Sequence, residues 1–244
     1  GTETIEPTFG LPAMWVDPDN REEATFKGYT VVDPATVITT HLTELIRDNM
    51  SELLSYVETQ NLLDELPNEH QKLIAEVVPN QISVGGIQRV LQNLLNERVS
   101  IRDLPTILEG ISEACAFTRN VTQLTEHVRS RLSRQISEQN STEDNFIPLV
   151  TLSAEWEQIF SDSILDQGED KQLSMAPSQL QRFIGAVRTT LDELADIEDP
   201  PVVLTSPLAR PFVRSIIERF RPATSIMSQN ELHPKAKIKT LGQI

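Results

Sequence analysis

The chain has 244 residues, of which 39% are hydrophobic, so it can bury a core in one large or two small domains. Its 21 lysines and arginines face 36 aspartates and glutamates, a formal charge of −15. Nucleic-acid binding depends on clustered positive charge, so this balance argues against nucleic acid and favours other proteins as partners. No apolar run is long enough for a membrane span and no signal peptide opens the sequence, so we expect this piece in the cytosol.

Signatures of catalysis, cofactor binding and metal binding are missing from the sequence. It contains no phosphate-binding glycine loop, zinc-protease motif, paired-cysteine motif or serine-hydrolase motif. The four histidines are scattered, at positions 41, 70, 127 and 233, and do not suggest a metal site. The single cysteine, Cys115, lies on the apolar stripe of an expected helix and indicates buried packing. We therefore expect a protein without enzymatic activity, cofactor or metal.

The first 53 residues indicate an incomplete α/β region. The turn-rich stretch PTFGLPAMWV at 7–16 precedes a short helical segment that ends near Gly28, and Trp15 is assigned to a core. Residues 29–32 are expected to form a strand, and Asp33-Pro34 opens a long helix. A lone pair of strands is marginally stable in water, so upstream residues of this region are expected to be absent.

Residues 54–140 are expected to form a helical domain of five short helices. The pattern of apolar residues is helical, and capping residues precede four helices: Asn68 with Gln71, Ser83, Asp103, and Asn120 with Gln123. The last helix, 120–136, has arginines on or beside it, at positions 119, 129, 131 and 134. We interpret them as a solvated face, with docking of an acidic protein as an alternative.

After a polar linker at 139–145, the pattern becomes an alternation of strands and helices. Strands are expected at 147–152, 202–205, 225–228 and 237–244, with an acidic loop at 166–171. Helices are expected through Trp156 and Phe160, through Leu180 to Leu194, and after Ser206-Pro207. Such alternation is typical of a mainly parallel sheet. The fold class is therefore α/β with a central all-helical subdomain, and the N-terminal α/β part is truncated.

Three long stretches together resemble one known family: GYTVVDPATVITTHLTELI at 28–46, VLQNLLNERVSIRDLPTILE at 90–109, and the ending SQNELHPKAKIKTLGQI. They are similar to the cytoplasmic part of the FHIPEP family of flagellar type III export-gate proteins, and more distantly to its injectisome counterparts. The resemblance implies four cytoplasmic subdomains behind an inner-membrane domain. Residues 1–53 would be the tail of the first two, 54–140 the helical third and 141–244 the α/β fourth. The membrane domain would be missing here, and this piece would lie on the cytoplasmic side.

The resemblance also implies a cleft that binds export chaperones carrying late flagellar substrates. Its carboxylate, phenylalanine and threonine match Glu6, Phe9 and Thr40, with Val32 and Val37 as lining residues. Glu6 departs from the family's usual aspartate, which keeps the charge and adds one methylene. An exposed aromatic with a carboxylate at its rim suits peptide recognition. The alternative is structural: Phe9 in a core, Glu6 solvated and the Thr40 hydroxyl bonded to its own helix.

Members of the family form nine-membered rings through the helical subdomain, and the resemblance points to Arg89, Arg102 and Asp103 as ring contacts. Asp103 also has a local explanation, since it caps a helix. Other export-apparatus proteins are further expected partners, with membrane contact only through the missing N-terminal part. Two other hypotheses are an enzyme with a site in the C-terminal α/β domain, near Ser153, Thr205 and Ser206, and a helical DNA-binding regulator that uses the arginine-rich helix.

Overall fold

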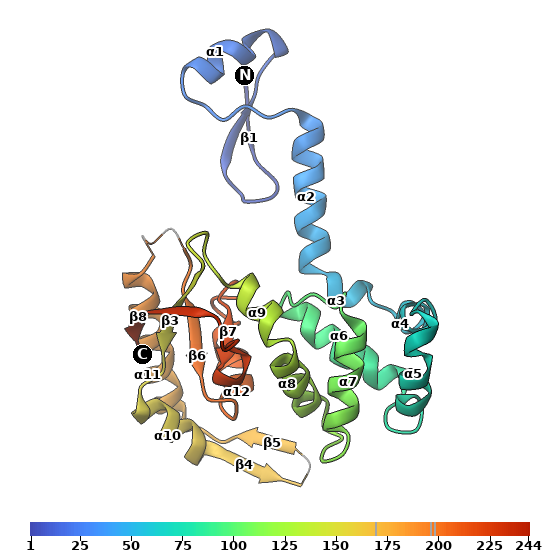
Figure 1. Ribbon diagram of the computed structural model, residues 1–244. Coiled ribbons are helices and arrows are strands. Elements are labelled where there is room, and N and C mark those ends of the chain that lie inside the picture. The colour runs from blue at the N-terminus through green and yellow to red at the C-terminus, as the bar shows by residue number, and fades with distance from the viewer. Residues whose placement is uncertain (169, 196, 198) are drawn as a thin grey trace. The chain divides into compact units, whose positions relative to one another are not determined.

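The computed structural model describes residues 1–168, 170–195, 197 and 199–244. The chain divides into two units, Gly1–Leu54 and Ser55–Ile244 (Figure 1). Among the described residues, no helix combines the length and the apolar character that crossing a bilayer requires.

The first unit consists of a β-hairpin followed by helices. Its elements are β1 (Thr2–Ile5), β2 (Pro12–Trp15), the 3₁₀ helix η1 (Pro18–Asn20), α1 (Arg21–Phe26), α2 (Pro34–Asp48) and α3 (Met50–Leu53). β1 and β2 pair antiparallel, with Thr2 opposite Trp15. α2 begins at the predicted place because the Asp33 carboxylate accepts the Thr36 N–H at 3.0 Å and Pro34 sets the backbone angle of the first turn.

Two predictions for this unit are wrong. Residues 29–32 form no strand, because β1 and β2 pair with each other and no strand of the described chain lies beside this segment. Trp15 was assigned to a core but is 52% exposed, since the two-stranded ribbon has no covering layer among the described residues. Residues 1–53 are all described, and none of them is buried. This unit therefore has no apolar core of its own.

The second unit begins with helices. They are α4 (Tyr56–Asp64), η2 (Asn68–His70), α5 (Gln71–Val77), α6 (Val84–Asn96), α7 (Leu104–Ala114), α8 (Val121–Arg131) and α9 (Ser133–Gln139). Ser83, Asp103 and Asn120 each accept a backbone N–H of the helix that follows, as predicted. The capping pair at Asn68 is wrong, because Asn68 opens a 3₁₀ turn and α5 begins only after it. The single helix expected at 120–136 is divided at Leu132 into α8 and α9.

Apolar side chains of these helices form a closely packed core. Fully buried members are Val77, Ile87, Val90, Leu91, Leu94, Ile107, Leu108, Ile111 and Val128. Each such side chain stabilises the fold by roughly 1.5–3 kcal/mol relative to exposure. Cys115 is buried at the edge of this core, as predicted. The helical periodicity of the sequence therefore identified the buried face correctly.

The rest of the second unit is an α/β sheet structure. Its strands are β3 (Phe146–Thr151), β6 (Val202–Thr205), β7 (Ile226–Ser228) and β8 (Lys237–Gln243), in the order β7-β6-β3-β8. All three pairings in this sheet are parallel, which confirms the predicted class. The helices are α10 (Ala154–Ser163), α11 (Pro177–Glu193), α12 (Arg210–Ile217) and the 3₁₀ helix η3 (Gln229–Glu231). The ring of Phe183 in α11 is edge-on to two other core rings, with centroid distances of 4.9 Å to Phe160 and 5.1 Å to Trp156.

Two details of this part differ from expectation. The described residues of the segment expected as an acidic loop, 166–168 and 170–171, belong to a hairpin of β4 (Ile164–Gln167) with β5 (Asp170–Leu173), while residue 169 lies outside the described residues. The antiparallel pairing satisfies backbone groups of a polar sequence. The helix expected after Ser206 starts only at Arg210. Ser206 instead closes a turn, accepting the Ala209 N–H on its hydroxyl at 3.3 Å and the Arg210 N–H on its carbonyl at 3.0 Å.

Candidate partner-binding site

The turn between β1 and β2 is fixed by Glu6. Its carboxylate accepts the backbone N–H of Thr8 at 2.9 Å and of Phe9 at 2.7 Å. Its backbone also closes the loop, since its N–H donates to the Leu11 carbonyl at 2.8 Å and its carbonyl accepts the Gly10 N–H at 3.0 Å. Gly10 has a φ of +68°, a conformation that glycine adopts without strain. Glu6 therefore fixes the backbone of the turn that carries Phe9.

The surroundings of Glu6 favour its ionised form. The Thr8 side chain has the largest effect and lowers the pKa of the Glu6 carboxyl. Desolvation, the second-largest effect, raises this pKa, but the backbone N–H groups of Phe9 and Thr8 and the charge of His41 lower it further, so that the net shift is downward. The influence of His41 also shows that the turn lies near the middle of α2. Figure 1 shows the hairpin loop beside this helix.

Phe9 is 65% exposed, which contradicts the alternative that it belongs to a core. The hairpin exposes other large apolar side chains too, namely Ile5, Leu11, Met14 and Trp15. The turn thus presents an aromatic ring on an apolar surface, with an ionised carboxylate at its base.

The other predicted residues of this site come from α2 and the segment before it. Val37 and Thr40 are half-buried and three residues apart, which places them on one helix face, and Val32 is exposed. Thr39 and Thr43 bond their hydroxyls to carbonyls of their own helix, at 2.8 and 2.7 Å. The Thr40 hydroxyl makes no hydrogen bond with any described residue, in contrast to the structural alternative.

The predicted ring residues lie in the helical part of the second unit. Arg89 of α6 and Arg102 before α7 are exposed, and neither side chain forms an ion pair within the described chain. Asp103 has a structural role, because its carboxylate accepts the Thr106 N–H at 3.3 Å and caps α7. The two arginines are the members of this set that remain available for an intermolecular contact.

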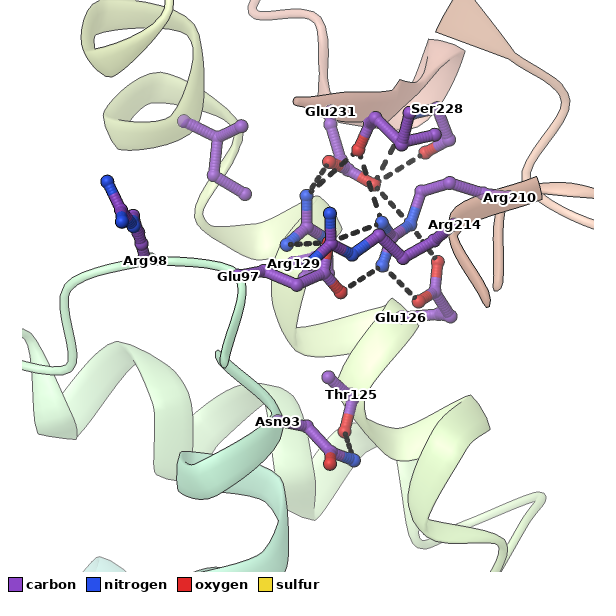
Figure 2. A network of polar contacts seen from close by, with 12 residues as sticks. Asn93, Glu97, Arg98, Thr125, Glu126, Arg129, Arg210, Arg214, Ser228 and Glu231 are labelled. Atoms are coloured by element: carbon purple, nitrogen blue, oxygen red, sulfur yellow. Dashed lines mark hydrogen bonds and ion pairs between the residues drawn. The ribbon is translucent and has the colours of Figure 1, made fainter. Parts of the chain in front are cut away.

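Sequence reasoning missed a buried cluster of charges, which we call the charged seam: Glu97, Glu126, Arg129, Arg210, Arg214 and Glu231 (Figure 2). Glu97, Glu126 and Arg129 come from the helical part, and the others from the α/β part. The solvated-face interpretation is wrong for Arg129, which is 3% exposed. These residues are far apart in sequence and were brought together only by folding, so no spacing signalled them.

Arg210 is the centre of the charged seam. It is 1% exposed and bonds both oxygens of Glu97 at 2.8 Å and both oxygens of Glu126 at 2.7 Å. Burial opposes its charge, but Glu97, Glu126 and Glu231 outweigh this and raise the pKa of the Arg210 guanidinium. Burial raises the pKa of the Glu126 carboxyl, although Arg210 opposes the effect. Arg129 donates to Glu231 at 2.5 Å, so the seam joins the two parts through ion pairs in both directions.

The hydroxyls that an enzyme site would need have structural roles. Ser153 accepts the Trp156 N–H at 3.4 Å and caps α10, while Thr205 donates to Glu157 at 2.9 Å. Ser206 closes the turn before α12. No group of three or more potential metal ligands occurs among the described residues. The observations favour none of the catalytic arrangements considered from the sequence.

The fold and these sites define a mixed helical and α/β protein whose candidate functional features are exposed contact surfaces. The chain belongs to the FHIPEP family, whose model matches residues 1–237. This membership confirms the resemblance drawn from the three sequence stretches.

Relatives at the sequence level are flagellar proteins. The chain is 56% identical over 244 residues to flagellar biosynthesis protein FlhA of Caulobacter vibrioides and 37% identical over 244 residues to that of Bacillus subtilis. It is covered completely in both comparisons and spans 35% and 36% of the relatives' lengths. The chain therefore corresponds to about a third of these proteins.

Similar solved structures come from type III secretion. The Chlamydia pneumoniae CdsV protein matches with a TM-score of 0.85 and 28% identity, covering 96% of this chain and 67% of that one. The Chlamydia pneumoniae CdsV protein in its complex with CdsO matches with a TM-score of 0.84 and 28% identity, and the match covers 94% of this chain and 67% of that one. The nonameric EscV cytosolic domain from the type III secretion system matches with a TM-score of 0.72 and 26% identity, and the match covers 93% of this chain and 67% of that one.

Proposed function

We propose that this chain is part of the cytoplasmic platform of a flagellar type III export gate, an inner-membrane protein, and that it binds export chaperones with their late substrates. It acts by holding partners and catalyses no reaction. Residues 1–53, 54–140 and 141–244 serve as the tail of the first two subdomains, the helical subdomain and the C-terminal subdomain. Family membership and the relatives named FlhA support this assignment.

The observation that carries the proposed chaperone site is the Glu6 turn. It holds Phe9 exposed, and the Thr40 hydroxyl of α2 makes no hydrogen bond with another described residue. A central aromatic anchor commonly contributes 2 kcal/mol or more to binding, which corresponds to about a 30-fold change in affinity. Val32 and Val37 supply apolar surface to the same contact.

The test is Phe9→Ala in the full-length protein, with affinity for a late-substrate chaperone measured in vitro and late-substrate export measured in cells. We expect binding to weaken about 30-fold and export of late substrates to fall. Phe26→Ala is the matched control, because Phe26 is 95% exposed in the same unit and outside the site. If both variants bind like wild type, Phe9 is not the anchor.

We also propose that the full-length protein forms a nonameric ring and contacts further export-apparatus proteins. The nonameric EscV domain and the CdsV–CdsO complex, which resemble this chain, support these two proposals. Arg89 and Arg102 are the proposed ring contacts. Arg102→Glu should reduce the fraction of rings seen by electron microscopy, whereas Arg219→Glu, an equal charge change at another exposed position, should not. Equal ring fractions in both variants would remove Arg102 from the interface.

A further inference from the structure

A cavity of about 80 Å³ opens beside the charged seam, where the helical part meets the α/β part. Three arginines line it, Arg98, Arg129 and Arg214, against one glutamate, Glu97. A water molecule needs roughly 10–15 Å³ of such space, so this cavity has room for several waters or one small ion. The lining residues therefore include three positive charges and one negative charge.

Two of these arginines have hydrogen-bond donors that the described chain does not use. Nε and Nη1 of Arg129 and Nε of Arg214 are buried without a hydrogen bond. Glu97 lies 3.3 Å from Arg129 Nη1 and Glu218 lies 3.2 Å from Arg214 Nε, but neither carboxylate has hydrogen-bonding geometry. Buried donors are costly when unsatisfied, and charged ones more so. These N–H groups thus require an acceptor.

The glutamate in the lining does not supply that acceptor. Both carboxylate oxygens of Glu97 accept hydrogen bonds from Arg210 at 2.8 Å, so Glu97 already has a cationic partner outside the cavity lining. Figure 2 shows Glu97 between the guanidinium groups of the seam, with the Arg98 side chain pointing away from them. The unsatisfied donors belong to Arg129, which is 3% exposed, and to Arg214, whose side chain is 14% exposed.

We propose that this cavity binds a small tetrahedral oxyanion, of the phosphate or sulfate type, through Arg129 and Arg214. Guanidinium groups bond oxyanions strongly and with defined geometry, because their N–H donors are arranged as a planar fork. The bound anion accepts hydrogen bonds from α8 on one side and α12 on the other. It therefore strengthens the junction between the helical and α/β parts. This site is independent of the proposed chaperone site, since it lies in the other unit.

The test is titration of the 244-residue chain with inorganic phosphate at constant ionic strength, followed by NMR of the arginine Nε–H signals and by calorimetry. We expect saturable one-to-one binding that shifts the Arg129 and Arg214 signals. Sulfate should compete with phosphate, and acetate should not, which separates a tetrahedral anion from a carboxylate. A response that never saturates, or one that acetate reproduces, would overturn the proposal and leave a cavity filled with water.

Three substitutions sharpen the test. Arg214→Gln should weaken phosphate binding about tenfold or more, because it removes a charge-assisted hydrogen bond. Glu218→Gln should strengthen it severalfold, since this carboxylate competes for Arg214 Nε. Arg219→Gln is the matched control, an exposed arginine outside the cavity, and should change nothing. If Arg214→Gln does not fold, the phosphate affinity of Glu218→Gln still tests the proposal. No increase in that affinity would count against the site.

Discussion

Glu6 shows how one side chain can position a contact residue. A carboxyl group whose two oxygens accept backbone N–H groups stabilises a turn more strongly when it is ionised, and Glu6 accepts those of Thr8 and Phe9. The turn and the charge at its base therefore depend on the same titration. The Glu6 side chain is long enough for one carboxylate oxygen to reach the Phe9 N–H at 2.7 Å while the other accepts the Thr8 N–H.

The pKa of Glu6 is below its ordinary value of 4.5 in the folded chain. The stabilisation that its ionised form gives to the turn is consequently present above pH 4.5 and is lost as the pH falls through the lowered folded value. We expect the Phe9 amide proton shift to titrate with a midpoint below 4.5 in NMR spectra, and this titration to vanish in Glu6→Gln. A midpoint at or above 4.5 would show that the carboxylate is not held by the turn.

Arg210 is the second residue whose removal should have a large effect. Arg210→Met leaves Glu97, Glu126 and Glu231 without their shared cation, and breaking a buried ion pair from one side costs about 3–5 kcal/mol. Urea unfolding followed by circular dichroism should detect this loss in the free energy of unfolding. Arg219→Met, at an exposed position, should stay within about 0.5 kcal/mol of wild type. A loss of under 1 kcal/mol for Arg210→Met would mean that the seam contributes little stability.

At the scale of elements, the sequence predicted helix starts and strands correctly where residues close together in the chain determine them. Ser83 and Asp103 cap helices by bonding an N–H three residues on, so the sequence shows both partners at once. The strand at 202–205 was predicted at its observed limits, because a short apolar run bounded by prolines has few other outcomes. The predictions failed where the structure of a segment depends on residues that are distant in the sequence. Residues 29–32 have strand-forming side chains but no neighbouring strand, and Arg129 has a helical surface pattern but a buried partner, Glu231.

The two roles suggested for Asp103 can be separated by substitution. Asp103→Ala removes the cap of α7 and should lower the free energy of unfolding by about 1 kcal/mol, within a range of 0.5–2. Asp103→Ser keeps a capping oxygen without the charge and should lose less than half as much. Thermal unfolding of both variants checks this. Equal stability of the alanine variant and wild type would show that the cap contributes no stability. The proposed role of Asp103 as a ring contact would then be favoured over the capping role.

At the scale of the molecule, burial divides the chain sharply. The second unit contains apolar side chains with no exposed surface in both its helical and its α/β parts, for example Leu91 and Phe183. The first unit has no buried residue between positions 1 and 53. The sequence predicted the α/β and helical classes because periodicity is a local property. It could not predict the charged seam, whose partners are separated by up to 113 residues.

This difference in burial predicts different behaviour for the two units when they are separated. Ordering a residue costs about 1–2 kcal/mol of backbone entropy, and only buried apolar surface offsets that cost on the scale required. A fragment of residues 55–244 should therefore unfold cooperatively in urea, whereas a fragment of residues 1–54 should show no sigmoidal transition. The urea dependence of the free energy scales with the surface that unfolding exposes, so the whole chain and the 55–244 fragment should have equal slopes within the error of the measurement. A cooperative transition in the 1–54 fragment, or a clearly steeper slope for the whole chain, would mean that the first unit buries surface of its own.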